Sequence, residues 1–165
     1  MIEINKKQIA LVDDEKNILT SVSLILRSEG FSVKTYENGE DAIKGFENTP
    51  PNLVLLDIKM PRMNGRELLL KIRSSKNQDI KNIPVIFLTS KDDEQDEIVG
   101  LRMGAADYIK KPFSQKLLNE RIRTVLRIYN NRMYDNNENN LEAINNSDEL
   151  VLADAKQLCF WKKNE

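Results

Sequence analysis

Short apolar runs alternate with amphipathic stretches over the first 130 residues of the chain. Runs of four to six mainly apolar residues predict strands, and apolar residues that recur every three or four positions predict helices. Strands are expected at 9–12, 31–36, 53–56, 84–88 and 107–110. Helices are expected around the apolar positions of 18–26, 42–46, 68–72, 98–103 and 117–126.

Five strand-then-helix units in series predict an α/β domain over about residues 1–130, in which a parallel sheet carries helices on both faces. The run 31–36 alternates between apolar and polar residues, which is typical of an exposed edge strand. Sheets of this class bind ligands in the crevice outside the carboxyl ends of their strands. The residues that follow each strand are therefore the candidates for chemistry.

The composition changes after Tyr129. Eight of the residues 130–146 are asparagine, and few are apolar, so this stretch cannot bury enough surface to fold alone. We expect a linker over 131–147, with a helical extension to about Tyr134 left open. Two short strand-like runs at 149–152 and 157–161 then predict a β-hairpin in the tail, 148–165.

Charge and composition exclude several function classes. The 25 basic and 26 acidic residues give a net charge of −1, which is no global reason to expect nucleic-acid or membrane binding. No apolar run approaches the roughly 18 residues that span a bilayer, and no signal peptide is recognisable, so we expect a cytoplasmic protein. The single cysteine, Cys159, and the lack of histidine exclude a Ser-His-Asp triad, a His-ligated zinc and a phosphohistidine on this chain.

Polar side chains follow four of the five predicted strands. Asp13 and Asp14 follow the first, Asp57 the third, Thr89 the fourth and Lys111 the fifth. Three carboxylates that meet at one edge would raise each other's pKa unless a cation joined them, and Mg²⁺ prefers such oxygen ligands. A lysine and a hydroxyl at the same point suit a phosphoryl group. The edge is thus equipped to place a phosphoryl group on a carboxylate.

Each of these features alone has an ordinary explanation. An Asp-Asp pair after a strand is usually a turn or a helix cap, a single acid after a strand is usually a loop residue, and Tyr108 on a strand is usually packing. Their coincidence at four strand ends favours a functional site.

Four segments together resemble the receiver domain of response regulators: 11–15 (LVDDE), 55–61 (LLDIKMP), 88–90 (LTS) and 107–113 (DYIKKPF). The resemblance covers about residues 6–130. It implies a doubly wound, flavodoxin-like (βα)5 fold with a five-stranded parallel sheet in the order 2-1-3-4-5. It also implies that a sensor histidine kinase is the partner that donates the phosphoryl group, and that the chain is no enzyme beyond its own phosphorylation and dephosphorylation.

The resemblance assigns a role to each site residue. Asp57 would be the phosphoacceptor, and Lys111 would pair with the phosphoryl oxygens. Mg²⁺ would be coordinated by Asp14, Asp57 and the backbone carbonyl of Lys59, with Asp13 acting largely through water.

The resemblance also implies a switch. Thr89 and Tyr108 would form the switch pair, and the peptide before Pro112 would be cis. Their movement would change the face formed by the helix at 98–103, the strand at 107–110 and the helix at 117–126, through which activated receivers form homodimers.

The tail resembles the first strands of the winged-helix DNA-binding domain of the OmpR/PhoB family, truncated early, and 113–118 is similar to the ChvI-like branch. This implies a transcriptional regulator whose phosphorylated receiver dimerises on DNA. The chain itself lacks a recognition helix and is not expected to bind specific DNA. The alternative is a stand-alone receiver or phosphorelay protein that acts through protein contacts.

The ion pairs that usually join OmpR/PhoB receivers are incomplete here. We hypothesise that a shifted pairing between chains replaces them, Glu97 with Lys116 or Asp107 with Arg121 or Arg127. The positions expected to carry the usual charges are occupied by Glu97, Ala106, Asp107, Leu117, Arg121 and Ile128.

Two enzyme classes fit less well. An aspartyl phosphatase on a similar sheet needs a second acid two residues after its nucleophile, where this chain has Lys59. A nucleotide-binding enzyme needs a glycine-rich loop after the first strand, and none follows 9–12.

Overall fold

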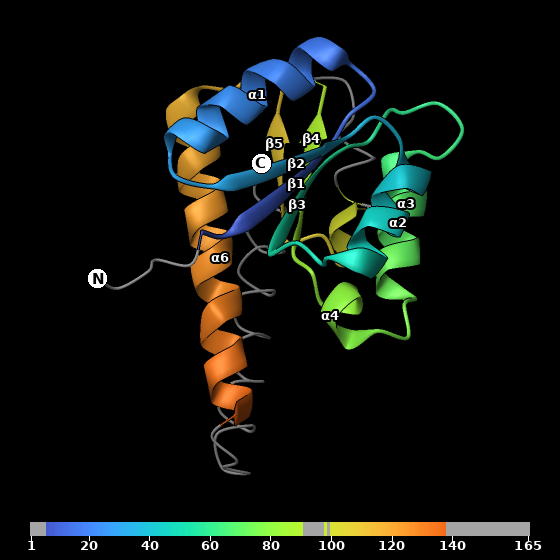
Figure 1. Ribbon diagram of the computed structural model, residues 1–165, viewed down its shortest axis with the longest axis vertical. Coiled ribbons are helices and arrows are strands. Elements are labelled where there is room, and N and C mark those ends of the chain that lie inside the picture. The colour runs from blue at the N-terminus through green and yellow to red at the C-terminus, as the bar shows by residue number, and fades with distance from the viewer. Residues whose placement is uncertain (1–5, 91–97, 99, 138–165) are drawn as a thin grey trace. The chain divides into compact units, whose positions relative to one another are not determined.

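The computed structural model describes residues 6–90, 98 and 100–137 (Figure 1). Its five strands form one parallel sheet in the order β2-β1-β3-β4-β5, which confirms the predicted fold class and strand order. The strands are β1 (Gln8–Val12), β2 (Ser32–Tyr36), β3 (Leu53–Asp57), β4 (Val85–Thr89) and β5 (Asp107–Lys110).

The burial of each strand follows its place in the sheet. β3 and β4 are buried along their whole length, and β1 is buried except at its first residue. Strands covered on both faces need nearly continuous apolar runs, which explains their composition. β2 lies at one edge and has no fully buried residue, as its alternating sequence predicts.

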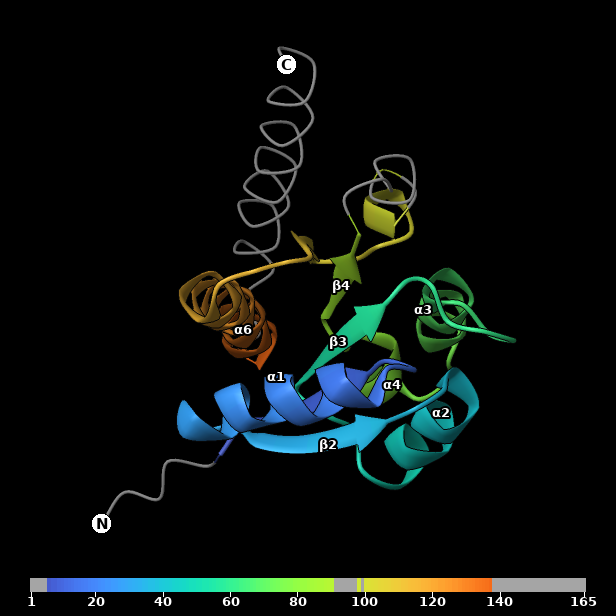
Figure 2. The same cartoon turned by 90° about the horizontal axis from the view of Figure 1, so that it is seen from above.

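The helices cover both faces of the sheet (Figures 1 and 2). α1 and α6 lie on one face, and α2, α3 and α4 lie on the other. Residues 98 and 100–102 are also helical, within the helix expected at 98–103. The bounds are α1 (Lys16–Ser28), α2 (Gly39–Asn48), α3 (Gly65–Arg73), α4 (Gln78–Lys81) and α6 (Gln115–Asn137).

Strand residues alternate between the two faces, so each face has its own core. On the α2–α3–α4 face, Ala10, Val54, Leu56, Val85 and Phe87 pack with buried helix residues. The same cluster includes Ala42, Phe46, Leu68, Leu69, Ile72 and Ile80.

Two helices begin with the same local sequence, Asn-Gly. Asn38 caps α2, and its side-chain oxygen accepts the backbone N–H of Asp41 at 2.8 Å. Asn64 caps α3 in the same way, accepting from Glu67 at 3.0 Å. An asparagine cap satisfies an N–H group that the first turn leaves unpaired, and therefore sets where each helix begins.

The short helix α4 was not predicted from the sequence. It follows the C-terminal end of α3 and buries one apolar side chain, that of Ile80. Arg73, the last residue of α3, holds this region together. Its guanidinium donates to the backbone carbonyls of Lys81 at 2.9 Å, Ile83 at 2.7 Å and Gly104 at 2.8 Å. One side chain thus joins α3 to the segments that lead into β4 and β5.

The chain divides into two units within its last described helix. The first unit comprises residues 1–127 and the second 128–165, and α6 crosses the boundary between them. α6 continues to Asn137, past the end of the predicted domain at 130 and beyond the extension to about Tyr134. The predicted hairpin at 148–165 and the rest of the linker lie outside the described residues. Within the described part of the chain, no helix is long and apolar enough to cross a membrane.

We predict that Arg73→Ala lowers the free energy of unfolding by about 2 kcal/mol, because three carbonyls at the ends of helical segments lose a charged donor. Arg73→Lys should recover less than half of this loss, since one ammonium cannot reach three carbonyls in the planar geometry of a guanidinium. Urea unfolding measures both. Lys71→Ala removes an exposed positive charge from the same turn and is the control. Equal, small losses in Arg73→Ala and Lys71→Ala would contradict the prediction.

Candidate functional site: an acidic cluster at the strand ends

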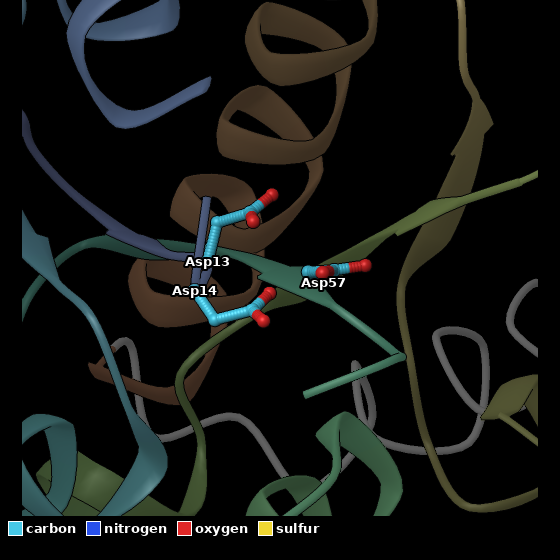
Figure 3. A group of neighbouring side chains, drawn as sticks. All are labelled: Asp13, Asp14 and Asp57. Carbon is cyan, nitrogen blue, oxygen red and sulfur yellow. The ribbon is translucent and has the colours of Figure 1, made fainter. Parts of the chain in front are cut away.

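Three carboxylates meet at the carboxyl ends of β1 and β3. Asp13 and Asp14 follow β1 directly, and Asp57 is the last residue of β3. Because β1 and β3 are hydrogen-bonded neighbours, one oxygen from each carboxylate lies within 4.8 Å of the others. Figure 3 shows the three side chains projecting to the same side of these strand ends. Asp13 is fully buried, Asp57 is 7% exposed and Asp14 is exposed.

Lys111 brings a positive charge to this cluster. Its Nζ lies 3.1 Å from Oδ2 of Asp13 and 3.7 Å from Oδ1 of Asp57. Its backbone N–H donates to the carbonyl of Thr89 at 2.6 Å, so β4 positions the lysine just beyond the end of β5. The Lys111–Pro112 peptide is cis, as predicted.

Backbone N–H groups satisfy the oxygens that face the protein. Oδ1 of Asp13 accepts the N–H of Glu15 at 2.9 Å. Oδ1 of Asp57 accepts the N–H of Lys59 at 3.4 Å, a longer and weaker bond. The hydrogen bond from Glu15 was not predicted from the sequence, because a main-chain N–H can come from almost any residue type.

The charges at this edge do not balance. The pKa of Asp57 is raised to about 7. Burial is the largest cause and the charges of Asp13 and Asp14 act in the same direction, while Lys111 and the N–H of Lys59 lower the pKa. Burial by itself would lower the pKa of Lys111, but the carboxylates of Asp57 and Asp13 outweigh it, and the pKa is raised. One lysine therefore does not neutralise three acids, and the raised pKa of Asp57 is the consequence.

A magnesium ion fits this set of residues. Carboxylate oxygens are its preferred protein ligands, and two positive charges would relieve the repulsion that raises the pKa of Asp57. Asp13, Asp14 and Asp57 are the described residues that could hold it. Lys59, whose carbonyl is the fourth expected ligand, lies in the loop that begins directly after β3.

The predicted switch residues lie on β4 and β5. Thr89 is the last residue of β4 and is 1% exposed. Tyr108 is half-buried on β5, pairs in register with Phe87, and packs against the core of the α2–α3–α4 face. The two residues therefore occupy neighbouring strands. Thr89 pairs with Lys110, so it lies two positions closer to the carboxyl end of the sheet than Tyr108 does.

One charge pair of the expected dimer face is satisfied inside a single chain. Arg121 Nη1 lies 3.0 Å from Oδ2 of Asp107, because the start of β5 lies beside the second turn of α6. This differs from the pairing between chains that the sequence suggested for these two residues. Glu97, the other acid of that hypothesis, lies outside the described residues. Ile98 and Leu117 are exposed apolar residues in the same two helical regions.

The comparisons with known proteins decide the family. Residues 9–123 match the family model described as "Response regulator receiver domain". The chain belongs to this family. The receiver is 39% identical over 121 residues to the alkaline phosphatase synthesis transcriptional regulatory protein PhoP of Bacillus subtilis, covering 73% of this chain and 49% of PhoP. It is 38% identical over 160 residues to the "Probable transcriptional regulator ycf27" of Porphyridium aerugineum, covering 97% of this chain and 64% of that relative.

Solved structures of receiver domains have the same fold as this chain. The receiver superposes on a response regulator receiver domain protein (CheY-like) of Methanospirillum hungatei with a TM-score of 0.71 and 32% identity, covering 78% of this chain and 99% of that one. The receiver is thus similar to whole CheY-like chains, whereas the chain spans about half to two thirds of the two transcriptional regulators.

We predict that Asp57→Asn stabilises the metal-free receiver at pH 8 by about 2 kcal/mol. A carboxyl whose pKa rises from 3.8 to about 7 on folding adds stability below pH 4, and this contribution is lost as the pH rises through 7. At pH 8 the buried charge is costly and asparagine removes it. At pH 5 the wild-type carboxyl is protonated, so the gain should shrink.

Urea unfolding in EDTA at both pH values measures this difference. Glu47→Gln, an exposed carboxylate in α2, is the control and should change stability little at either pH. A loss of stability in Asp57→Asn at pH 8 would contradict the assigned charge imbalance.

Proposed function

We propose that this receiver accepts a phosphoryl group on Asp57 from a phosphohistidine of a sensor kinase, with Mg²⁺, and that phosphorylation controls a transcriptional regulator of the OmpR/PhoB type. One observation carries the proposal. The carboxylate of Asp57 stands at the carboxyl end of β3 beside two further acids, with a lysine ammonium 3.7 Å away. This arrangement suits an acyl phosphate, which needs an ionised oxygen nucleophile and positive charge around the phosphoryl oxygens.

The transfer forms one bond and breaks one. An oxygen of the Asp57 carboxylate attacks phosphorus, the P–N bond to the donor imidazole breaks, and its electron pair stays on the nitrogen. Lys111 supplies positive charge to the phosphoryl oxygens, and the Thr89 hydroxyl is the nearby donor on β4. A bound Mg²⁺ would neutralise the carboxylates and the incoming phosphoryl oxygens.

The same residues argue against turnover on other substrates. An aspartyl phosphatase has a second acid two residues after its nucleophile, and this chain has Lys59 at that position. The site therefore lacks the carboxyl group that would act as the general acid. We therefore propose that the receiver catalyses only its own phosphorylation and dephosphorylation.

The output is proposed to pass through the switch pair. Thr89 would move toward the phosphoryl group and Tyr108 would turn inward, which would change the surface of the helical residues around 98–103, β5 and α6. Exposed Ile98 and Leu117 would lie at the resulting homodimer contact, as apolar anchors of a protein interface do. The relatives named as transcriptional regulators support the proposal that DNA binding is the output of the whole protein, in the cytoplasm where sensor kinases act.

Phosphorylation by a small-molecule donor tests the central step. We expect acetyl phosphate and Mg²⁺ to add one phosphoryl group to the wild type by intact mass, and none to Asp57→Asn. Lys111→Gln should lower the rate by at least tenfold, because the pKa of Asp57 rises and the phosphoryl oxygens lose their cation. Lys110→Gln removes the adjacent exposed lysine and should label at nearly the wild-type rate.

Labelling that persists in Asp57→Asn would contradict the assignment of the acceptor. Sustained release of p-nitrophenol from p-nitrophenyl phosphate would favour a phosphatase instead, since a receiver should stop after one group per chain.

A further inference from the structure

The loop between β3 and α3 is closed by a contact that only glycine permits. Gly65, the first residue of α3, donates its N–H to the carbonyl of Ile58 at 2.8 Å. A Cβ at this position would lie 2.5 Å from the carbonyl oxygen of Asp57 and 2.8 Å from Cα of Ile58. Both neighbours are backbone atoms, so no side-chain rotation could relieve the collision. The first turn of α3 therefore presses directly on the backbone of the phosphoacceptor.

We propose that Gly65 is a positioning residue for the magnesium site. Its missing side chain lets α3 hold the peptide between Ile58 and Lys59 in one place. That peptide carries the N–H that donates to Oδ1 of Asp57, and the next carbonyl along the chain is the expected backbone ligand, that of Lys59. The inference rests on the proposed function, because it concerns how the same site is shaped.

The loop is the part that must move if a side chain is added at Gly65. α3 cannot retreat easily, because Leu68, Leu69 and Ile72 are fully buried in the core. Asp57 is held by its pairing with Leu88 of β4. The peptide between Ile58 and Lys59 lies beyond the last pair of the β3–β4 ladder, so we expect it to be the part that is displaced. Mg²⁺ demands oxygens at about 2.0–2.1 Å in octahedral geometry, so a small displacement of a carbonyl ligand weakens binding.

The chain contains a matched comparison in α2. Gly39 follows a capping asparagine and begins its helix, as Gly65 does. A Cβ at Gly39, however, would meet the side chain of Met63, at 2.6 Å from its sulfur. A thioether end can rotate away, whereas the backbone of Asp57 cannot. Gly39→Ala therefore reproduces the change in residue type and helix position, but its collision is with the movable side chain of a residue in the β3–α3 loop and not with the backbone of the acceptor.

Magnesium binding by calorimetry tests the proposal. We expect Gly65→Ala to raise the dissociation constant of Mg²⁺ at least tenfold, which is the size of effect that residues supporting metal ligands usually show. Gly39→Ala should stay within about twofold of the wild type. Gly45→Ala, which collides with the ring of Tyr36 away from the β3–α3 loop, shows whether loss of stability alone weakens binding and should also stay within twofold.

Amide hydrogen exchange on the wild type tests the same claim should Gly65→Ala fail to fold. If glycine packing shapes the loop, the amide of Gly65 is protected in EDTA, before any metal binds. Protection that develops only with Mg²⁺ would mean that the ion orders the loop, and would overturn the proposal. So would a Gly65→Ala variant that binds Mg²⁺ within twofold of the wild type. A wild type that binds no Mg²⁺ would overturn the proposed function as well.

Discussion

Excess negative charge at the carboxyl ends of β1 and β3 is the constraint on which this receiver depends. Asp13 and Asp57 are buried beside each other with one lysine between them, and the pKa of Asp57 rises to about 7 as a result. A folded domain tolerates such a cluster when the surrounding backbone is held firmly. The negative charge then serves to bind a cation or to attack a phosphoryl group. The cluster is costly for stability, and we interpret this cost as the price of a reactive carboxylate.

The rest of the sheet supplies the required rigidity. β1 and β3 are buried strands paired in register, and the strand order reverses direction between them, which is where such sheets place their sites. Main-chain contacts then fix the loops above the strands: Glu15 to Asp13, Lys111 to Thr89 and Gly65 to Ile58. The donor in each of these contacts is a main-chain N–H, and the acceptor is the Asp13 carboxylate in the first and a main-chain carbonyl in the other two, so no further charged side chain is needed to hold the loops.

Sequence patterns predict the strands well because buried parallel strands need continuous apolar runs. The strand order was available only through the resemblance to receivers, since periodicity says nothing of which strands are neighbours. The helix α4 was missed because its four residues bury only Ile80, too little for a periodic signal. Arg73 and Gly65 were missed for a different reason: their partners are backbone atoms of segments that only the fold brings close. An Asn-Gly pair at a helix start indicates a cap, but does not reveal what the glycine touches.

The site was predictable as a set of residues, because parallel strands bring their carboxyl ends to one edge. Its electrostatics were predictable only in direction, since the burial of Asp57 and the two distances from Lys111 set the balance. The pair of Asp107 and Arg121 shows the limit of charge patterns, which do not distinguish a bond within a chain from one between chains.

The pKa of the Asp57 carboxyl, followed by carbon NMR during a pH titration, tests the account most directly. We expect a value of about 7 in EDTA, and below about 5 once Mg²⁺ is bound, because the ion stabilises the ionised form. A value near 4 in EDTA that Mg²⁺ leaves unchanged would show that burial and the repulsion among the three carboxylates do not raise the pKa of Asp57, and would contradict the account.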